Sequence, residues 1–208
     1  GHHVLIVTRG KNYKEDLKAI RSYIDEVRPI RIGVDGGADA LLEFGYQPDI
    51  IVGDMDSASD SSLYQCREII VHAYPDGHAP GMERIRKLGL SARVFPYPGT
   101  SEDVALILAH ENKAELIVTV GSHTNMIDFL EKGRRGMAST FLVRMKVGYN
   151  VIDAKGVSEL YRNQFRPAYL AALFLAVLLP ISMVARMSPL MQELYQLITL
   201  RLKILVGL

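Results

Sequence analysis

Two aspartates separated by a single residue carry the clearest chemical signal in this chain. Asp54 and Asp56 follow an apolar run at residues 50–52, with Gly53 before them and Ser57 after them. In an extended chain, residues two apart project to the same side, so the two carboxylates can act together. Paired carboxylates offer Mg²⁺ the oxygen ligands that it prefers, and a glycine lets the backbone approach a phosphate closely. The sequence therefore predicts a site for Mg²⁺ and phosphate at this turn.

A second acidic turn, Asp35-Gly36-Gly37, follows another apolar run at residues 30–34. Each acidic turn also has a purely structural explanation. Asp35 could close a tight turn and cap the next helix, and Asp54 and Asp56 could be turn and cap residues for a helix that begins near Ser59. These alternatives stay open at the level of the sequence.

Apolar, β-type runs alternate with segments of helical period along the first 160 residues. The runs that predict strands are residues 4–8, 30–34, 50–52, 68–72, 93–95, 116–120 and 150–153. The segments that predict helices are residues 14–27, 37–44, 81–88, 101–111, 126–132 and 137–146. Strands separated by helices indicate βαβ units, and Ile- and Val-rich strands with little alternation indicate a sheet that is covered on both faces. The predicted fold class is α/β, with a doubly wound, mainly parallel sheet.

Polar turns that contain glycine follow five of the predicted strands. In open α/β sheets, ligands bind at the carboxyl ends of the strands, where such turns meet. Besides the two acidic turns, they are Thr8-Arg9-Gly10, the segment 98–103 and Gly121-Ser122-His123-Thr124. The acids of segment 98–103 could instead stabilise the first turn of a helix through its dipole, and the turn at 121–124 could be an ordinary strand–helix connection. The recurrence of such turns at one predicted edge favours a binding site.

Composition limits the classes of function. The chain has 208 residues, 49% of them hydrophobic, and a formal net charge of +1, so its bulk charge does not indicate a nucleic-acid partner. A single cysteine, Cys66, excludes an intramolecular disulfide and fits a reducing compartment. The chain begins Gly1-His2-His3 and enters an apolar run at once, so we expect further sequence before residue 1.

An uncharged segment at residues 167–185, bracketed by Arg166 and Arg186, follows the predicted α/β region. Its length is close to the ~20 apolar residues that cross a bilayer, so we expect a transmembrane helix there. A buried core helix and a helix that forms oligomers are the alternatives. Residues 189–208 have apolar side chains at helical spacing, which favours an amphipathic helix on a membrane surface or in the groove of a partner.

The residues of the two acidic turns resemble the catalytic domain of thiamine pyrophosphokinases. The shared pattern is D-G-G-A at 35–38, a leucine-containing helix, and P-D-x-I-V-G-D-x-D-S at 48–57. The resemblance covers roughly residues 4–130. It implies that a Mg²⁺–ATP complex binds at the acidic turns and that a substrate hydroxyl attacks the β-phosphorus, which releases AMP. It also implies that Asp54 and Asp56 are metal ligands and that Asp35-Gly36-Gly37 lies beside the nucleotide.

Three departures from that family bear on the substrate. The family's Thr-Asp pair appears here as Thr100-Ser101-Glu102-Asp103, so Ser101 takes the aspartate position and Glu102 or Asp103 would have to supply the carboxylate. The family's G-G-x-x-D-H becomes G-S-H-T-N-M at 121–126, which lacks its acid and its histidine. Where the family has a thiamine-binding β-sandwich, this chain continues into residues 146–162 and the uncharged segment. Thiamine is therefore not the expected substrate.

The chain as a whole also resembles the SteA-like proteins, which are named as components of the cytokinetic ring. The segments that carry this resemblance are residues 13–17, 72–77, 99–103, 129–134, 136–141 and 153–158. The match includes the apolar C-terminal helix, and those proteins carry an additional N-terminal region. The resemblance implies a pyrophosphokinase-like domain that is anchored to the cytoplasmic membrane and linked to cell division or envelope growth.

These observations predict a pyrophosphokinase-like α/β domain at residues 1–160 and membrane-anchor or interaction helices at residues 161–208. We expect the α/β domain on the cytoplasmic side of the membrane, with Mg²⁺ and ATP as cofactors, and a division-machinery protein or a second copy of the chain as partner. The predicted catalytic and metal-binding residues are Asp54, Asp56 and Asp103. The predicted nucleotide-binding residues are Asp35, Gly36, Gly37, Gly53, Ser57, Thr100, Ser101, Gly121, Ser122, His123 and Thr124.

Three interpretations of the function stay open. The first is an ATP-dependent diphosphokinase that acts on an unknown hydroxyl group. The second is a non-catalytic cytokinetic scaffold that retains the fold. The third is a soluble domain that forms oligomers through its apolar C-terminal helices.

Overall fold

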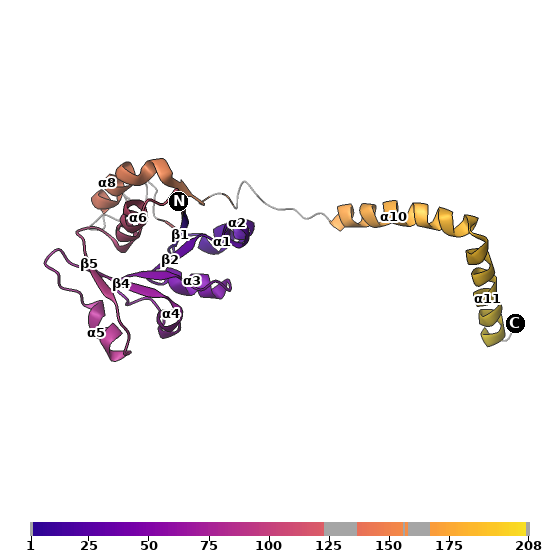
Figure 1. Cartoon of the computed structure of the whole chain (residues 1–208), viewed down its shortest axis with the longest axis horizontal. Coiled ribbons are helices and arrows are strands. Elements are labelled where there is room, and N and C mark those ends of the chain that lie inside the picture. Colours follow the sequence, from indigo (N-terminus) through magenta and orange to yellow (C-terminus); the bar gives the residue numbers. More distant parts are fainter. Residues whose placement is uncertain (1, 123–136, 156, 158–166, 207–208) are drawn as a thin grey trace. The chain divides into compact units, whose positions relative to one another are not determined.

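The computed structural model describes residues 2–122, 137–155, 157 and 167–206. The chain divides into two compact units, Gly1–Arg162 and Asn163–Leu208. The centre of the first unit is a 7-stranded sheet in the order β5-β4-β3-β2-β1-β6-β7, and every neighbouring pair of strands is parallel (Figure 1). The strands are β1 His3–Val7, β2 Ile30–Val34, β3 Ile50–Gly53, β4 Glu68–Ala73, β5 Arg93–Pro96, β6 Leu116–Val120 and β7 Val151–Asp153.

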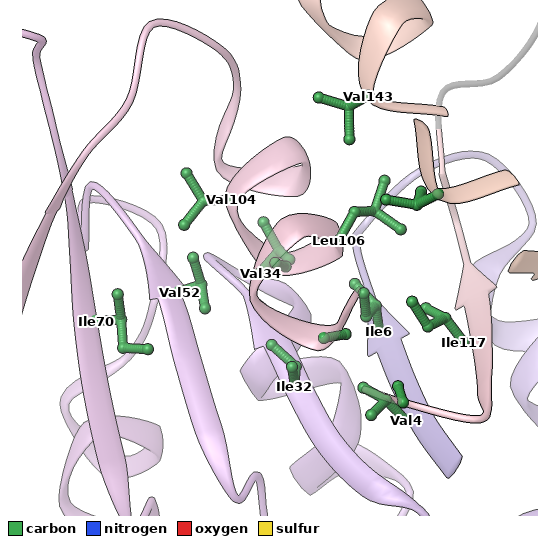
Figure 2. Close-up of a cluster of buried hydrophobic side chains, with 14 residues drawn as sticks. Val4, Ile6, Ile32, Val34, Val52, Ile70, Val104, Leu106, Ile117 and Val143 are labelled. Atoms are coloured by element: carbon green, nitrogen blue, oxygen red, sulfur yellow. The ribbon is translucent and has the colours of Figure 1, made fainter. Parts of the chain in front are cut away.

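Helices cover both faces of this sheet, because successive side chains of each strand point to opposite faces and both sets are apolar. On one face, Ile32 and Val52 of the strands belong to one core cluster with Val104 of α6 and Val143 of α8, which Figure 2 shows. The bounds of these two helices are Ser101–Glu111 for α6 and Met137–Val147 for α8.

The opposite face is covered by helices from the first half of the chain. Leu5 of β1 belongs to a core cluster with Leu17 of α1, and Ile51 of β3 belongs to a cluster with Leu63 of α4. The helices on this side are α1 Tyr13–Ala19, α2 Arg21–Val27, α3 Gly37–Glu43, α4 Asp60–Gln65 and α5 Gly81–Lys87. The predicted α/β class with a doubly wound, parallel sheet is confirmed.

Most of the predicted elements lie within two residues of their observed bounds. The helix predicted at 14–27 is in fact two helices, α1 and α2, which meet at Ile20, where the backbone leaves the helical region. The apolar spacing of Leu17, Ile20 and Ile24 continues across this break, so the sequence pattern could not reveal it. The helix predicted at 126–132 lies outside the described residues.

The second unit contains two helices, α10 Pro167–Met187 and α11 Pro189–Val206. Large apolar side chains of α10, such as Leu173, Phe174 and Leu179, are exposed. None of the helices in the described part of the chain has both the length and the apolar character needed to cross a bilayer. The transmembrane span expected at residues 167–185 is therefore not confirmed.

Candidate functional site

The order of the strands brings the predicted turns together at one edge of the sheet. The chain steps from β1 to β2 in one direction and later returns to place β6 on the other side of β1, so the strand order reverses there. The turns after β1 and β6 touch each other: the Thr8 hydroxyl donates to the Val120 carbonyl over 3.0 Å, and a Cβ on Gly10 would collide with the Gly121 carbonyl oxygen. In doubly wound folds, ligands bind in the crevice beside such a reversal.

The turn after β2 holds Asp35 in a restricted conformation. Asp35 has a φ of 47°, in the left-handed region, and its N–H donates to the Val52 carbonyl of the next strand over 2.9 Å. A Cβ on Gly53 would collide with Asp35 Oδ1, so only glycine leaves room for this carboxyl group at the end of β3. A Cβ on Gly37 would collide with the Val7 carbonyl oxygen. Three neighbouring strand ends thus fix the position of Asp35.

The environment of Asp35 disfavours its charge. Burial raises the pKa of this carboxyl group from 3.8 to about 7, and repulsion by the neighbouring Asp54 adds to the rise. Asp35 Oδ1 is buried and has no hydrogen-bond partner. A buried polar atom without a partner is costly, and a proton on this carboxyl group lowers that cost, in line with its raised pKa.

The turn after β3 presents two exposed carboxylates on either side of a buried methionine. Met55 is fully buried with a φ of 68°, so the chain is not extended here as the same-side argument assumed. The Asp56 N–H donates to Asp54 Oδ1 over 3.1 Å, which closes a tight turn. Arg84, a residue of α5, donates a hydrogen bond to the Met55 carbonyl and so stabilises the turn. Although the turn differs from the expected geometry, both carboxylates line one cavity.

This cavity has a volume of about 590 Å³, which is the size of a small-molecule site. It lies at the carboxyl ends of β3, β4 and β5. Its polar and aromatic lining comes from Asp54, Asp56, His72, Tyr74, Tyr97, Thr100 and Ser101. The structure therefore brings Thr100 and Ser101 together with the paired aspartates, as predicted.

The structural alternative for the paired aspartates holds only in part, because Asp54 is a turn residue that accepts from the Asp56 N–H, whereas Ser59, and neither aspartate, caps α4. The Ser59 hydroxyl accepts from the Ser62 N–H over 3.2 Å, and its own proton goes to Asp39. The carboxylates of Asp54 and Asp56 are thus available to a ligand in the cavity.

Asp103 has a structural environment that differs from that of the other two predicted ligands. Its Oδ2 accepts hydrogen bonds from the Thr100 N–H at 2.8 Å, the Ser139 hydroxyl at 3.0 Å and the Thr140 hydroxyl at 3.3 Å. It forms a capping box with Thr100 and joins α6 to α8. Asp103 is fully buried and does not line the cavity. This arrangement fits the helix-start explanation of segment 98–103.

The predicted residues after β6 are only partly described. Gly121 contacts the turn after β1, and the Ser122 hydroxyl donates to Asp153 of β7 over 2.9 Å. Neither of them lines the cavity. His123 and Thr124 lie outside the described residues. Within the described ranges, no three His, Cys, Asp or Glu side chains cluster closely enough to hold a metal ion by themselves.

Sequence reasoning missed two residues at this edge. His72 lies near the carboxyl end of β4, with Nε2 at 2.9 Å from the Tyr97 carbonyl oxygen and Nδ1 at 3.2 Å from Ser101 Oγ. Arg9 reaches over the glycine turn, where a Cβ on Gly36 would meet its Cδ at 3.0 Å. His72 could have been found from its position near the carboxyl end of a predicted strand. Arg9 could have been found from its position in the turn after β1.

Two family models match separate segments of the chain. Residues 21–78 match the model of the thiamin pyrophosphokinase catalytic domain. Residues 155–206 match the model of the SteA-like C-terminal domain. The first match contains both acidic turns and His72, and the second contains all of α10 and α11. Both resemblances drawn from the sequence are thus confirmed.

Three solved structures that are similar to this chain carry the name of a thiamine pyrophosphokinase or a probable one. The Geobacillus thermodenitrificans protein is 21% identical with a TM-score of 0.46, and the match covers 73% of this chain and 58% of that one. The Bacillus subtilis protein is 23% identical with a TM-score of 0.42 and the same two coverages, 73% and 58%. A probable thiamine pyrophosphokinase from Staphylococcus saprophyticus is 20% identical with a TM-score of 0.40, and the match covers 73% of this chain and 62% of that one. The chain thus spans less than two thirds of each of these proteins, and no curated protein matches it.

Proposed function

We propose that the α/β domain binds a Mg²⁺–nucleotide complex in the cavity at the carboxyl ends of β3, β4 and β5. The observation that carries this proposal is the pair Asp54 and Asp56: both carboxylates are exposed and line one cavity of about 590 Å³. The pair lies within the segment that matches the thiamin pyrophosphokinase catalytic domain.

The residues of the cavity fit a magnesium ion that shares its ligands with a nucleotide. Mg²⁺ is commonly held by one or two carboxylates, with phosphate and water oxygens at its other positions. Asp54 and Asp56 would hold the ion, which agrees with the absence of a larger acidic cluster among the described residues. Bound there, Mg²⁺ would neutralise charge on the phosphates. Asp35 lies beside Asp54 but does not complete a three-residue cluster for the ion, so it would influence the site through its charge and not as a third ligand.

Other residues of the site suit the remaining parts of a nucleotide. Arg9 is exposed above the turn at Gly36 and pairs with Glu43 at 3.4 Å, and we propose that its guanidinium exchanges this partner for a phosphate oxygen. Tyr74 and Tyr97 give the cavity aromatic walls, on which a planar base can stack.

The reaction that we propose is pyrophosphoryl transfer from ATP to a hydroxyl group, as in the family that the acidic turns resemble. The rival is a non-catalytic scaffold, and the observation that favours it is Ser101, which stands where the family has an aspartate. The open cavity with its exposed acidic pair favours retained nucleotide binding over a decayed site.

A role in cell division or envelope growth is the second part of the proposal. It rests on the match of residues 155–206 to the SteA-like C-terminal domain. Attachment of residues 167–185 to the cytoplasmic membrane, with the α/β domain on the cytoplasmic side, belongs to the same proposal. Fractionation of cells and imaging of a fluorescent fusion test both. Recovery in the soluble fraction, or a uniform signal across the cell, would contradict them.

Calorimetric titration with ATP in millimolar Mg²⁺ tests the nucleotide site. We expect the double variant Asp54→Asn/Asp56→Asn to bind at least ~10-fold more weakly than the wild type, because its neutral side chains no longer hold the ion. Asp25→Asn is the matched control, since Asp25 is an exposed carboxylate of α2 that contacts Tyr46 and does not line the cavity. Undetectable binding to the wild type, or equal binding by the double variant, would contradict the proposal.

A further inference from the structure

A serine and a histidine meet inside the cavity in an arrangement that assigns their protons. His72 Nε2 lies 2.9 Å from the Tyr97 carbonyl oxygen, and His72 Nδ1 lies 3.2 Å from Ser101 Oγ. A carbonyl oxygen can only accept a hydrogen bond, so Nε2 must carry the hydrogen. In the neutral ring, Nδ1 then has a free lone pair and accepts the hydroxyl proton of Ser101. The Tyr97 carbonyl thus fixes the tautomer and the orientation of the ring.

This arrangement is the one that activates a weak hydroxyl nucleophile. A serine becomes reactive when an adjacent base can take its proton and a third group orients that base. Here the base is His72 and the orienting group is the carbonyl of Tyr97. A purely structural pair would be expected in the core, whereas His72 and Ser101 are each only half-buried and line the same cavity as Asp54 and Asp56.

We propose that Ser101 is the hydroxyl acceptor of the transferred group and that His72 is the base that takes its proton. This inference rests on the proposed nucleotide site. In the step, Ser101 Oγ attacks the β-phosphorus of the bound nucleoside triphosphate, and its proton moves to His72 Nδ1. The bond between the β-phosphorus and the oxygen shared with the α-phosphorus breaks, and that oxygen leaves with the electron pair. The products are a diphosphorylated Ser101 and the nucleoside monophosphate.

The surroundings of Ser101 suit a negatively charged product. Ser101 is the first residue of α6, a helix of 11 residues, and the N-terminal end of a helix stabilises an anion. The two acidic neighbours of Ser101 are already engaged away from the cavity. Glu102 pairs with Arg144 of α8 at 3.2 Å, and Asp103 accepts hydrogen bonds from Thr100 and from two hydroxyls of α8.

The test uses the whole chain, Mg²⁺, and ATP labelled in separate samples at the α- or the γ-phosphate. We expect the γ-label to become covalently attached, the α-label to leave as AMP, and mass spectrometry to place two phosphates on the peptide with Ser101. Ser101→Ala should lose the label, whereas the control Ser61→Ala should keep it, because Ser61 is an exposed residue of α4 outside the cavity. Circular dichroism establishes that each variant is folded.

The role of His72 requires a measurement that a structural role would not affect. We expect His72→Ala to slow labelling by about 100-fold, and added imidazole to restore part of the rate, since a free base can fill the space of the missing ring. If His72→Ala does not fold, His72→Gln provides the second variant and should also label slowly. Undiminished labelling in a folded His72 variant would overturn the assignment of the base.

The outcomes separate this inference from the function on which it rests. ATP binding is measured by calorimetry on the same samples. Binding without any label on Ser101, or a label that persists in Ser101→Ala, overturns the inference and leaves the nucleotide site intact. No binding at millimolar ATP overturns the proposed function itself. Release of ADP with a single phosphate on Ser101 would support Ser101 as the acceptor and overturn attack at the β-phosphorus.

Discussion

At the scale of single residues, the position of Asp35 depends on a glycine in the neighbouring strand. Gly53 ends β3, and any side chain there would occupy the space of the Asp35 carboxyl group. Asp35 in turn lies beside Asp54, whose charge adds to the rise of its pKa. A change at Gly53 should therefore affect both the fold and the site.

We expect Gly53→Ala to lower the free energy of unfolding by about 1–3 kcal/mol, because the new methyl group displaces Asp35 from a crowded, buried position. Chemical denaturation measures this loss, and ATP titration should show weaker binding. The matched control is Gly148→Ala, since a Cβ at Gly148 meets no atom within 4 Å. Equal stability of the two variants would mean that the turn adapts to a side chain at Gly53.

The raised pKa of Asp35 makes stability depend on pH in the absence of metal. Its pKa of about 7 in the folded chain lies above the ordinary value of 3.8, so between these values the folded state binds more protons. Stability should consequently fall as the pH rises from about 4 to about 7. Asp35→Asn removes this loss and suits the left-handed backbone at this position.

Urea denaturation in EDTA across this pH range checks the prediction. We expect Asp35→Asn to be more stable than the wild type by roughly 1–3 kcal/mol at pH 8, and the difference to vanish near pH 4. A constant difference at every pH would show that another group is responsible.

At the scale of the elements, Asp103 connects the helix that begins at the cavity to the helix that packs on it. Its Oδ2 accepts from Thr100 at the start of α6 and from Ser139 and Thr140 of α8. We expect Asp103→Ala to cost about 2–4 kcal/mol, because three donors lose their acceptor in a buried place. Thr100→Ala removes only the cap and should cost about 1 kcal/mol. Thermal unfolding compares the stability of the two variants. Equal losses of stability would show that the hydrogen bonds from Asp103 to α8 contribute nothing.

The sequence predicted the elements better than it predicted their contacts. The strands could be predicted because they are runs rich in Ile and Val, several of which end at glycine or aspartate. The paired aspartates could be predicted because they directly follow such a run. The approach of His72 to Ser101 was not visible, because it depends on how β4 pairs with β5 and on the loop that returns from β5 to α6. The hydrogen bonds of Asp103 could not be predicted either, since its partners Ser139 and Thr140 belong to a helix much later in the chain.

At the scale of the whole molecule, the core and the candidate site belong to one unit. All three buried clusters and the cavity lie within Gly1–Arg162, whereas α10 of the second unit has exposed Leu, Phe, Val and Ile side chains. Apolar surface of this extent is typical of sites that contact a partner or a lipid. The two units should therefore respond differently to truncation.

We expect residues 1–162 alone to unfold cooperatively and to bind ATP as the full chain does, since no core residue is removed. The full chain should associate, and mild detergent should reverse the association by covering α10. Sedimentation velocity at several concentrations measures both. A truncated chain without a cooperative transition would show that the C-terminal unit is needed for the fold.

The place of β1 in the sheet has a consequence for the growing chain on the ribosome. β1 pairs with β2 on one side and with β6 on the other, and β6 is made only after β2 to β5 and their helices. Until Leu116–Val120 emerges, one edge of β1 has no partner, and an open edge is able to pair with other chains. The half-made protein is thus exposed to aggregation at a strand that later lies in the interior of its sheet, between β2 and β6. Final closure depends on the last third of the α/β region being translated.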